Sequence, residues 1–421
     1  MSFQLINGSL NLQFGAFGTV ILAVLTLLLG SAVKKHSGFC RKYCIPSPVI
    51  GGVLFALLHL LFYLTGMLEL NLDTAYQNDM QYMFFTIVGF GASFSLLKKG
   101  GKKLILYFIL TGILILLEAC IGILGAKITG ISAIYGIICG PAPLAGGHGS
   151  VAAYGEMLEG AGYQGAMVTG MAAATFGLIA GSFFGGPLCS RLIRRNKLKT
   201  PSTAVQTKAS VSLSENASGD ASSANTEITM HSVFTHLALI GSFIVLGGIL
   251  GNHLSIGLGT LTGGKISLPG FCGPMLVAFV VRNVNEKFHF LVPNDKILHI
   301  MEELSLGIFL SMAMISLKLW ELVELAVPMV IILILELTAV LAFIYLLVFR
   351  LLGRDYEAAA CCAGLCGHSF GATPNGIANL KSVSEQFGYP AMAFLIVPIV
   401  GGFLQDIFLV PVNVFLINLF G

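Results

Sequence analysis

Long apolar stretches recur along almost the whole chain, and many approach or exceed the roughly 20 residues that a helix needs to cross a bilayer. Of the 421 residues, 56% are hydrophobic and only 10% are charged, whereas about a quarter of the residues in a soluble protein are charged. This pattern predicts a polytopic helical membrane protein. The formal net charge of +3 is too small to indicate a nucleic-acid partner.

The chain shows no motif for a cofactor, a metal centre or catalysis. Its nine cysteines lie mostly inside apolar segments, as in AAACCAGLCG from Ala358, without the spacing of a zinc or haem site. HExxH and a paired aspartate motif are missing, so we expect neither an enzyme nor a bound cofactor. The N-terminal MSFQLINGSLNLQ is uncharged, so we expect no cleavable signal peptide and interpret the apolar stretch after it as a first membrane helix.

One long polar segment divides the chain. Residues 196–230 are rich in serine, threonine, alanine and asparagine and contain too little apolar surface to fold. We therefore predict a disordered linker between two hydrophobic halves, residues 1–195 and 231–421.

The two halves contain similar segments in the same order. IPSPVIGGVLFALL from Ile45 resembles LPGFCGPMLVAFVV from Leu268. Further along each half, a long apolar segment carries a single glutamate, Glu118 or Glu336, and a Gly-rich break follows it. VGFGASFSLLKKG from Val88 also resembles LGIFLSMAMISLKLW from Leu306, and after each break come GYQGAM or GYPAM and another apolar segment. Six matches in one order indicate a duplicated unit.

The basic residues indicate how the two units are oriented, because lysine and arginine concentrate on cytoplasmic loops. We place five spanning helices in each half and let each Gly-rich segment enter and leave on one face. All basic residues except Lys127, Lys265 and Lys318 then lie inside. The prediction is two inverted repeats of five transmembrane helices with re-entrant hairpins near 132–158 and 358–384. Both termini lie outside and the linker is cytoplasmic.

The Gly-rich breaks, PAPLAGGHGSVAAYGE from Pro141 and LCGHSFGATPNGIANLKS from Leu365, contain the candidate binding residues. Non-helical backbone at membrane depth persists only where protein or a water-filled cavity covers it. Inverted repeats with interrupted helices are typical of secondary transporters, and helix N-termini favour anions. The predicted substrate-binding residues are Gly146, Gly147, His148, Gly149, Ser150, Gly371, Thr373, Asn375 and Asn379.

These segments resemble the bacterial glutamate:sodium symporter family in GGHGS from Gly146 and in GATPNGIANL from Gly371. The likeness covers nearly the whole chain except the linker. It implies ten transmembrane helices and sodium-driven uptake of L-glutamate across the bacterial inner membrane. It also implies a homodimer in membrane lipid, with core domains that move in an elevator-like step and sodium as the coupling ion.

The chain departs from the family pattern within both breaks. Ala145 replaces a serine of the family's SGGHGT, and the family's GFGLGATPT becomes GHSFGATPN here. His368 and Asn375 are therefore unusual. These differences leave open which substrate is carried and how many ions are coupled to it.

Three acidic residues are candidate ligands of the coupling ion: Asp406, Glu118 and Glu336. Asp406 matches the family's FFID, whereas the glutamates stand where the family has glutamine. A charge at mid-bilayer costs around 2.5–3.5 kcal/mol on insertion scales. A protonated or hydrogen-bonded glutamate between helices is therefore the alternative interpretation.

Two further alternatives remain open. His148 either lines the substrate site or relays a proton, or it is a neutral brace inside the hairpin. The same fold could carry another dicarboxylate or a 2-hydroxy acid, coupled to protons, and a passive channel is a more distant hypothesis. No lysine or arginine falls within either hairpin before Lys381, so the substrate's negative charge would be balanced by helix N-termini and sodium.

Overall fold

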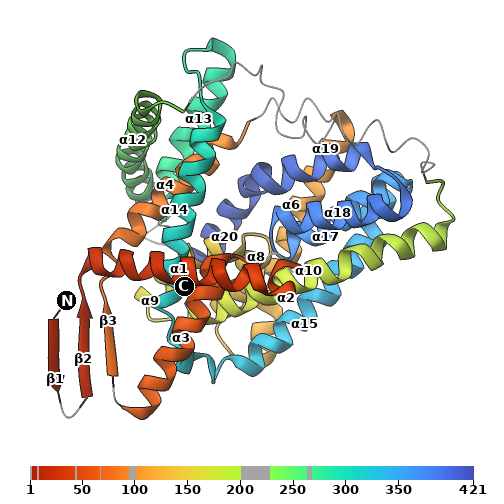
Figure 1. Cartoon of the computed structure of the whole chain (residues 1–421). Coiled ribbons are helices and arrows are strands. Elements are labelled where there is room, and N and C mark those ends of the chain that lie inside the picture. Colours follow the sequence, from red (N-terminus) through yellow and green to blue (C-terminus); the bar gives the residue numbers. More distant parts are fainter. Residues whose placement is uncertain are drawn as a thin grey trace.

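The computed structural model describes residues 2–6, 9–42, 45–66, 68–93, 101–200, 228–262 and 268–421, most of which lie in helices (Figure 1). Residues 201–227, most of the predicted linker, lie outside this description.

The helices of the first half are α1 (Ala16–His36), α2 (Gly38–Lys42), α3 (Ser47–Thr65), α4 (Ala75–Gly91), α6 (Gly101–Thr129), α7 (Ala133–Cys139), α8 (Pro141–Leu144), α9 (Gly147–Gly160) and α10 (Ala166–Asn196). Those of the second half are α12 (Met230–Thr262), α13 (Cys272–Phe288), α14 (Asp295–Ile315), the 3-10 turn η2 (Leu319–Leu322), α15 (Ala326–Phe343), the π-helical η3 (Ile344–Val348), α16 (Phe349–Leu351), α17 (Tyr356–Ser369), α18 (Thr373–Phe387), α19 (Ala391–Ile399), the π-helical η4 (Val400–Leu404) and α20 (Asp406–Phe420).

Eight of the described helices are long and apolar enough to cross a membrane, which confirms the predicted polytopic membrane protein. The other two expected spans correspond to α4 and α13, which have only 17 residues each. Both carry polar residues at one end, YQND near the start of α4 and RNVNEK near the end of α13. The total of ten spanning helices therefore stays a prediction.

A three-stranded sheet at the N-terminus adds to the predicted all-helical fold. β1 (Ser2–Ile6) pairs antiparallel with β2 (Ser9–Phe14), which pairs in parallel with β3 (Leu68–Leu72). SLNLQF and LELNL both alternate apolar and polar residues, the period of a strand, although we predicted no strand there. The sheet joins the start of α1 to the end of α3.

The long helices form two packed groups, each drawn from both halves of the sequence (Figure 1). The first helix group consists of α1, α3, α4, α12, α13 and α14, and the second of α6 to α10 and α15 to α20. Helices pack extensively within each group and more sparsely between groups, chiefly through α9 and α14.

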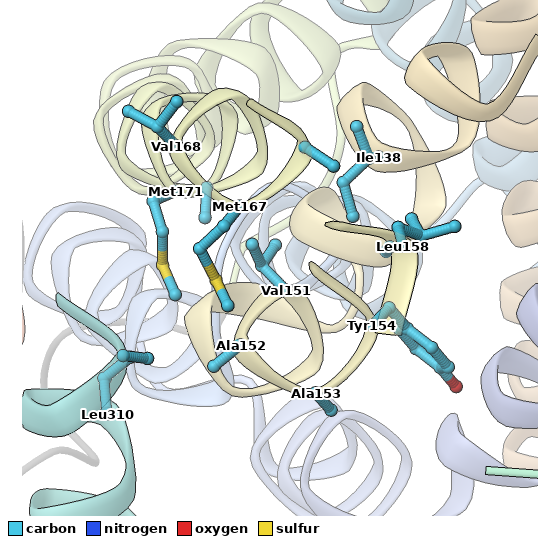
Figure 2. Packing of buried hydrophobic residues seen from close by; sticks show 14 of the residues in the cluster. Ile138, Val151, Ala152, Ala153, Tyr154, Leu158, Met167, Val168, Met171 and Leu310 are labelled. Carbon is cyan, nitrogen blue, oxygen red and sulfur yellow. The ribbon is translucent and has the colours of Figure 1, made fainter. Parts of the chain in front are cut away.

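The first interrupted segment is anchored in a large apolar cluster around α9. Figure 2 shows Val151 of α9 beside Met167 of α10 and Leu158 on the side of α9 that is turned away from Met167, while Leu310 approaches from α14 in the first helix group. All four side chains are buried, so the hydrophobic effect holds α9 against both of its neighbours.

Candidate functional site

The first Gly-rich stretch interrupts a helix. α7 ends at Cys139, and Gly140 then has φ −103° and ψ −114°. Pro141, which lacks an amide N–H, opens the single turn of α8. α9 begins at Gly147, whose φ of +65° suits glycine.

The second Gly-rich stretch interrupts another helix. α17 ends at Ser369 and α18 begins at Thr373, after Ala372 in an extended conformation (φ −160°, ψ 158°). Pro374 lies in the first turn of α18, where a missing N–H is tolerated.

The two interrupted segments meet. A Cβ on Gly170 of α10 would lie 2.6 Å from Val151 Cγ1 and 3.0 Å from Ile138 Cγ1, so both α7 and α9 lie against α10. In the second segment, Gly367 of α17 lies against the backbone of Gly376 of α18. A Cβ on Gly147 would lie 3.1 Å from Gly371 O, which places the two breaks in direct contact.

A cavity of about 810 Å³ opens where the breaks meet, between the two helix groups. The second group contributes Ala145 to Ser150 and Gly371 to Asn375. The first group contributes an apolar wall: Phe84, Phe85, Val88, Leu306 and Leu310. This volume is within the range of small-molecule sites.

Carboxylates, but no lysine or arginine of the described chain, line this cavity. Asp406, the first residue of α20, is half-buried there, and its carboxylate forms no hydrogen bond or ion pair with any described residue. Glu302 and Glu303 line the opposite side from α14. The absence of a cationic lining residue agrees with the sequence analysis.

His148 lies at the cavity with a defined hydrogen bond. Its Nε2 is 3.0 Å from Thr175 Oγ1, and that hydroxyl donates to Met171 O at 2.9 Å. Because the Thr175 hydrogen is used, the oxygen accepts from Nε2–H, which leaves Nδ1 of a neutral ring as an acceptor.

The two predicted asparagines occupy different positions. Asn375 lines the cavity; its Nδ2 donates to Leu178 O at 2.9 Å, while its buried Oδ1 has no partner among the described residues. Asn379 does not line the cavity. Its Nδ2 instead donates to Gly181 O and Ala363 O at 3.0 and 3.1 Å. Asn379 thus holds α18 against α10 and α17.

A buried chain of hydrogen bonds runs from α6 to the first break. Tyr107 Oη lies 2.8 Å from His368 Nε2, His368 Nδ1 lies 3.0 Å from Gln405 Oε1, and Gln405 Nε2 donates to Ala145 O at 2.9 Å. One assignment satisfies every group: Tyr107 donates to His368, which donates to Gln405. His368 is fully buried and does not line the cavity.

Glu118 and Glu336 lie apart from the cavity, on α6 and α15 of the second helix group, which pack together. Both are fully buried, and their four carboxylate oxygens have no hydrogen-bond partner in the part of the chain described. A Cβ on Gly140 would lie 2.9 Å from Glu336 Oε1, 2.9 Å from Gly136 O and 3.1 Å from Glu118 O. Oxygens from three helices therefore gather beside the first break.

Sequence reasoning missed two residues at the site, Thr175 and Gln405. Gln405 directly precedes Asp406, so the motif that identified Asp406 could also have identified Gln405. Thr175 lies in an alanine-rich stretch of α10 and carries no local signal. Its role depends on the packing of α9 against α10.

Interrupted helices that meet at a cavity inside a membrane bundle define the class of secondary transporters. A family model described as sodium/glutamate symporter matches residues 12–389. The chain is 33% identical over 403 residues to a protein of Escherichia coli named sodium/glutamate symporter, with 96% of each chain covered. It is also 33% identical over 406 residues to one of the same name from Haemophilus influenzae, with 94% of this chain and 95% of the relative covered. The chain therefore belongs to the sodium/glutamate symporter family and is a transporter, not an enzyme.

Proposed function

We propose that this chain carries L-glutamate into the cell by sodium-coupled symport, with the cavity between the helix groups as the binding site. Relatives over nearly the whole chain are named sodium/glutamate symporters. The observation that carries the proposal for the site is the contact between Gly147 and Gly371, which brings the starts of α9 and α18 to one cavity.

Both helix starts suit the carboxylates of glutamate. α9 and α18 have 14 and 15 residues, and neither has a side chain that caps its N-terminus. The first amides of α9 remain donors. At the start of α18, Pro374 has no N–H and the Asn375 and Gly376 amides donate to Ala372 O, so the Thr373 amide is the donor left there. The helix dipole adds partial positive charge at both starts. Ser150 and Thr373 line the same cavity and add hydroxyl donors, while His148 Nδ1 is an acceptor for the ammonium group.

Sodium would supply the positive charge that the cavity lining lacks. Asp406 and the unpartnered Oδ1 of Asn375 are oxygen donors of the kind that hard cations prefer, and both residues line the cavity. We propose that they contribute to the sodium site, together with backbone carbonyls at the breaks.

Transport would proceed by an elevator-like step, in which the second helix group moves relative to the first. Dense packing within each group, sparse packing between them and a cavity at their boundary support this proposal. The interrupted segments would act as re-entrant hairpins that move together with their group.

The proposed inverted repeat, residues 1–195 against 231–421, is supported by reciprocal packing. α3 contacts α14 while α13 contacts α4, and α1 contacts α14 while α12 contacts α4. A two-fold relation between the halves would place α1, α3 and α4 on α12, α13 and α14. It would therefore turn the first contact of each pair into the second. In this proposal both termini lie outside the cell and the linker is cytoplasmic. The protein is a homodimer in the bacterial inner membrane.

The buried Glu118 and Glu336 favour one alternative, a proton-coupled carrier of another dicarboxylate or of a 2-hydroxy acid. Purified protein in liposomes separates the two proposals. We expect labelled L-glutamate to accumulate only with an inward sodium gradient and to be displaced by excess unlabelled L-glutamate. Accumulation driven equally by a proton gradient without sodium, or competition by citrate but not by glutamate, would favour the alternative.

A further inference from the structure

A second, apolar cavity of about 440 Å³ lies on the outer side of the second helix group, between α10 and α15–η3. Phe184, Pro187 and Leu188 form one wall, and Leu341 and Leu346 are part of the other. Pro187 lacks an N–H inside α10, and η3 is a π-helical turn. Both features disturb regular helix geometry beside the groove.

Arginines gather at the end of this groove. Arg191 lines it, and the guanidinium carbons of Arg191 and Arg195 lie 6.0 and 5.8 Å from the ring centroid of Tyr345. Arg195 Nη1 also donates to Tyr345 Oη at 2.7 Å. Tyr345 therefore holds the guanidinium groups of Arg191 and Arg195 at the same end of the groove.

These arginines have no acidic partner in the described chain. The ion pairs found there join Lys103, Arg282, His299 and Lys318 to carboxylates, and none includes Arg191, Arg194 or Arg195. Arg191, Arg194 and Arg195 are all exposed, at the end of α10 that the charge bias predicts to be cytoplasmic. An unpaired cationic cluster above an apolar groove is complementary to a molecule with an anionic head and a hydrocarbon tail.

We propose that this groove binds one anionic phospholipid, with an acyl chain between α10 and α15–η3 and the phosphate on Arg191 and Arg195. Guanidinium groups bind phosphate through paired hydrogen bonds, and basic pockets between membrane helices recognise lipid head groups. The inference requires only the membrane location of the chain and is independent of the transported substrate.

The test measures lipid retention directly. The full chain is purified in detergent, offered phosphatidylglycerol and phosphatidylcholine of identical acyl chains, and analysed by native mass spectrometry. We expect one phosphatidylglycerol bound in preference to phosphatidylcholine. R191Q–R195Q should lower that preference roughly 30-fold, as expected from about two basic contacts. K34Q–K35Q, which removes two charges at the end of α1 in the other helix group, should leave it unchanged.

A second variant tests the groove itself. A342F introduces an aromatic side chain at a lining residue and should reduce retention of both lipids, while gel filtration reports whether each variant stays folded. Equal binding of the two lipids, or equal effects of the α1 and α10 charge changes, would overturn the proposal. So would preferential binding that appears only after deletion of residues 201–227, because the linker would then be the natural occupant.

Discussion

His148 combines two hydrogen-bonding roles that substitution can separate. Gln places its amide near the position of Nε2 and can keep the bond to Thr175, but it offers nothing at the position of Nδ1. We expect H148Q to raise the KM for glutamate by roughly 10- to 100-fold, the effect of losing one hydrogen bond to a charged group. The maximal uptake rate should change less.

T175V is the matched control for His148. It removes the hydroxyl that holds the ring but leaves Nδ1, so it should affect KM less than H148Q does. Sodium-driven uptake in liposomes gives both constants. If T175V raised KM while H148Q did not, the ring would be a structural brace.

Glu118 and Glu336 present a different problem at the residue scale, because their buried carboxylates have no donor among the described residues. Isolated buried charges cost several kcal/mol each, so a cation or protons must accompany them. If the pair holds one coupling cation, E118Q or E336Q should reduce by one the positive charges moved per glutamate. The reversal potential of uptake measures this number. Unchanged coupling in both variants would instead identify neutral acids that pack between α6 and α15.

At the scale of elements, α9 depends on a glycine at its start but not at its end. Gly147 has φ +65° and lies against Gly371 O, whereas a Cβ on Gly160 would have no neighbour within 4 Å. G147A should cost about 1–2 kcal/mol from the left-handed backbone alone and displace the second break, so uptake should fall strongly. G160A should be neutral or stabilise by up to about 1 kcal/mol. Thermal unfolding and uptake of the two variants check this, and equal behaviour would contradict the close contact of the breaks.

The elements that sequence predicts well are those with local chemistry. Gly140, Pro141 and Pro374 mark the interruptions because glycine and proline act through their own backbone. The N-terminal sheet was missed although its strands alternate in polarity, because pairing of β2 with β3 joins segments more than 50 residues apart. Asn379 was assigned to the substrate on motif grounds. Its bonds to α10 and α17 follow from packing, which a single sequence does not display.

At the scale of the whole molecule, a polar contact crosses between the helix groups: Gln77 Nε2 of α4 donates to Glu156 Oε2 of α9 at 2.8 Å. The salt bridge between Lys103 and Asp355, 2.7 Å across, lies within the second group. If the groups move past each other, a covalent link at the first position should abolish transport, whereas a link at the second should not. We expect Q77C–E156C to lose most of its uptake after treatment with a short bifunctional thiol reagent.

K103C–D355C is the control, treated with the same reagent. Six of the native cysteines are buried, and Cys40, Cys44 and Cys120 are replaced by serine in both variants. Mass spectrometry confirms each link, and uptake is measured before and after. Because the reagent, the number of thiols and the polar character of the contacts match, a difference in uptake reports relative motion of the groups. Full activity of cross-linked Q77C–E156C would exclude a displacement of α9 past α4 and, with it, the elevator-like step.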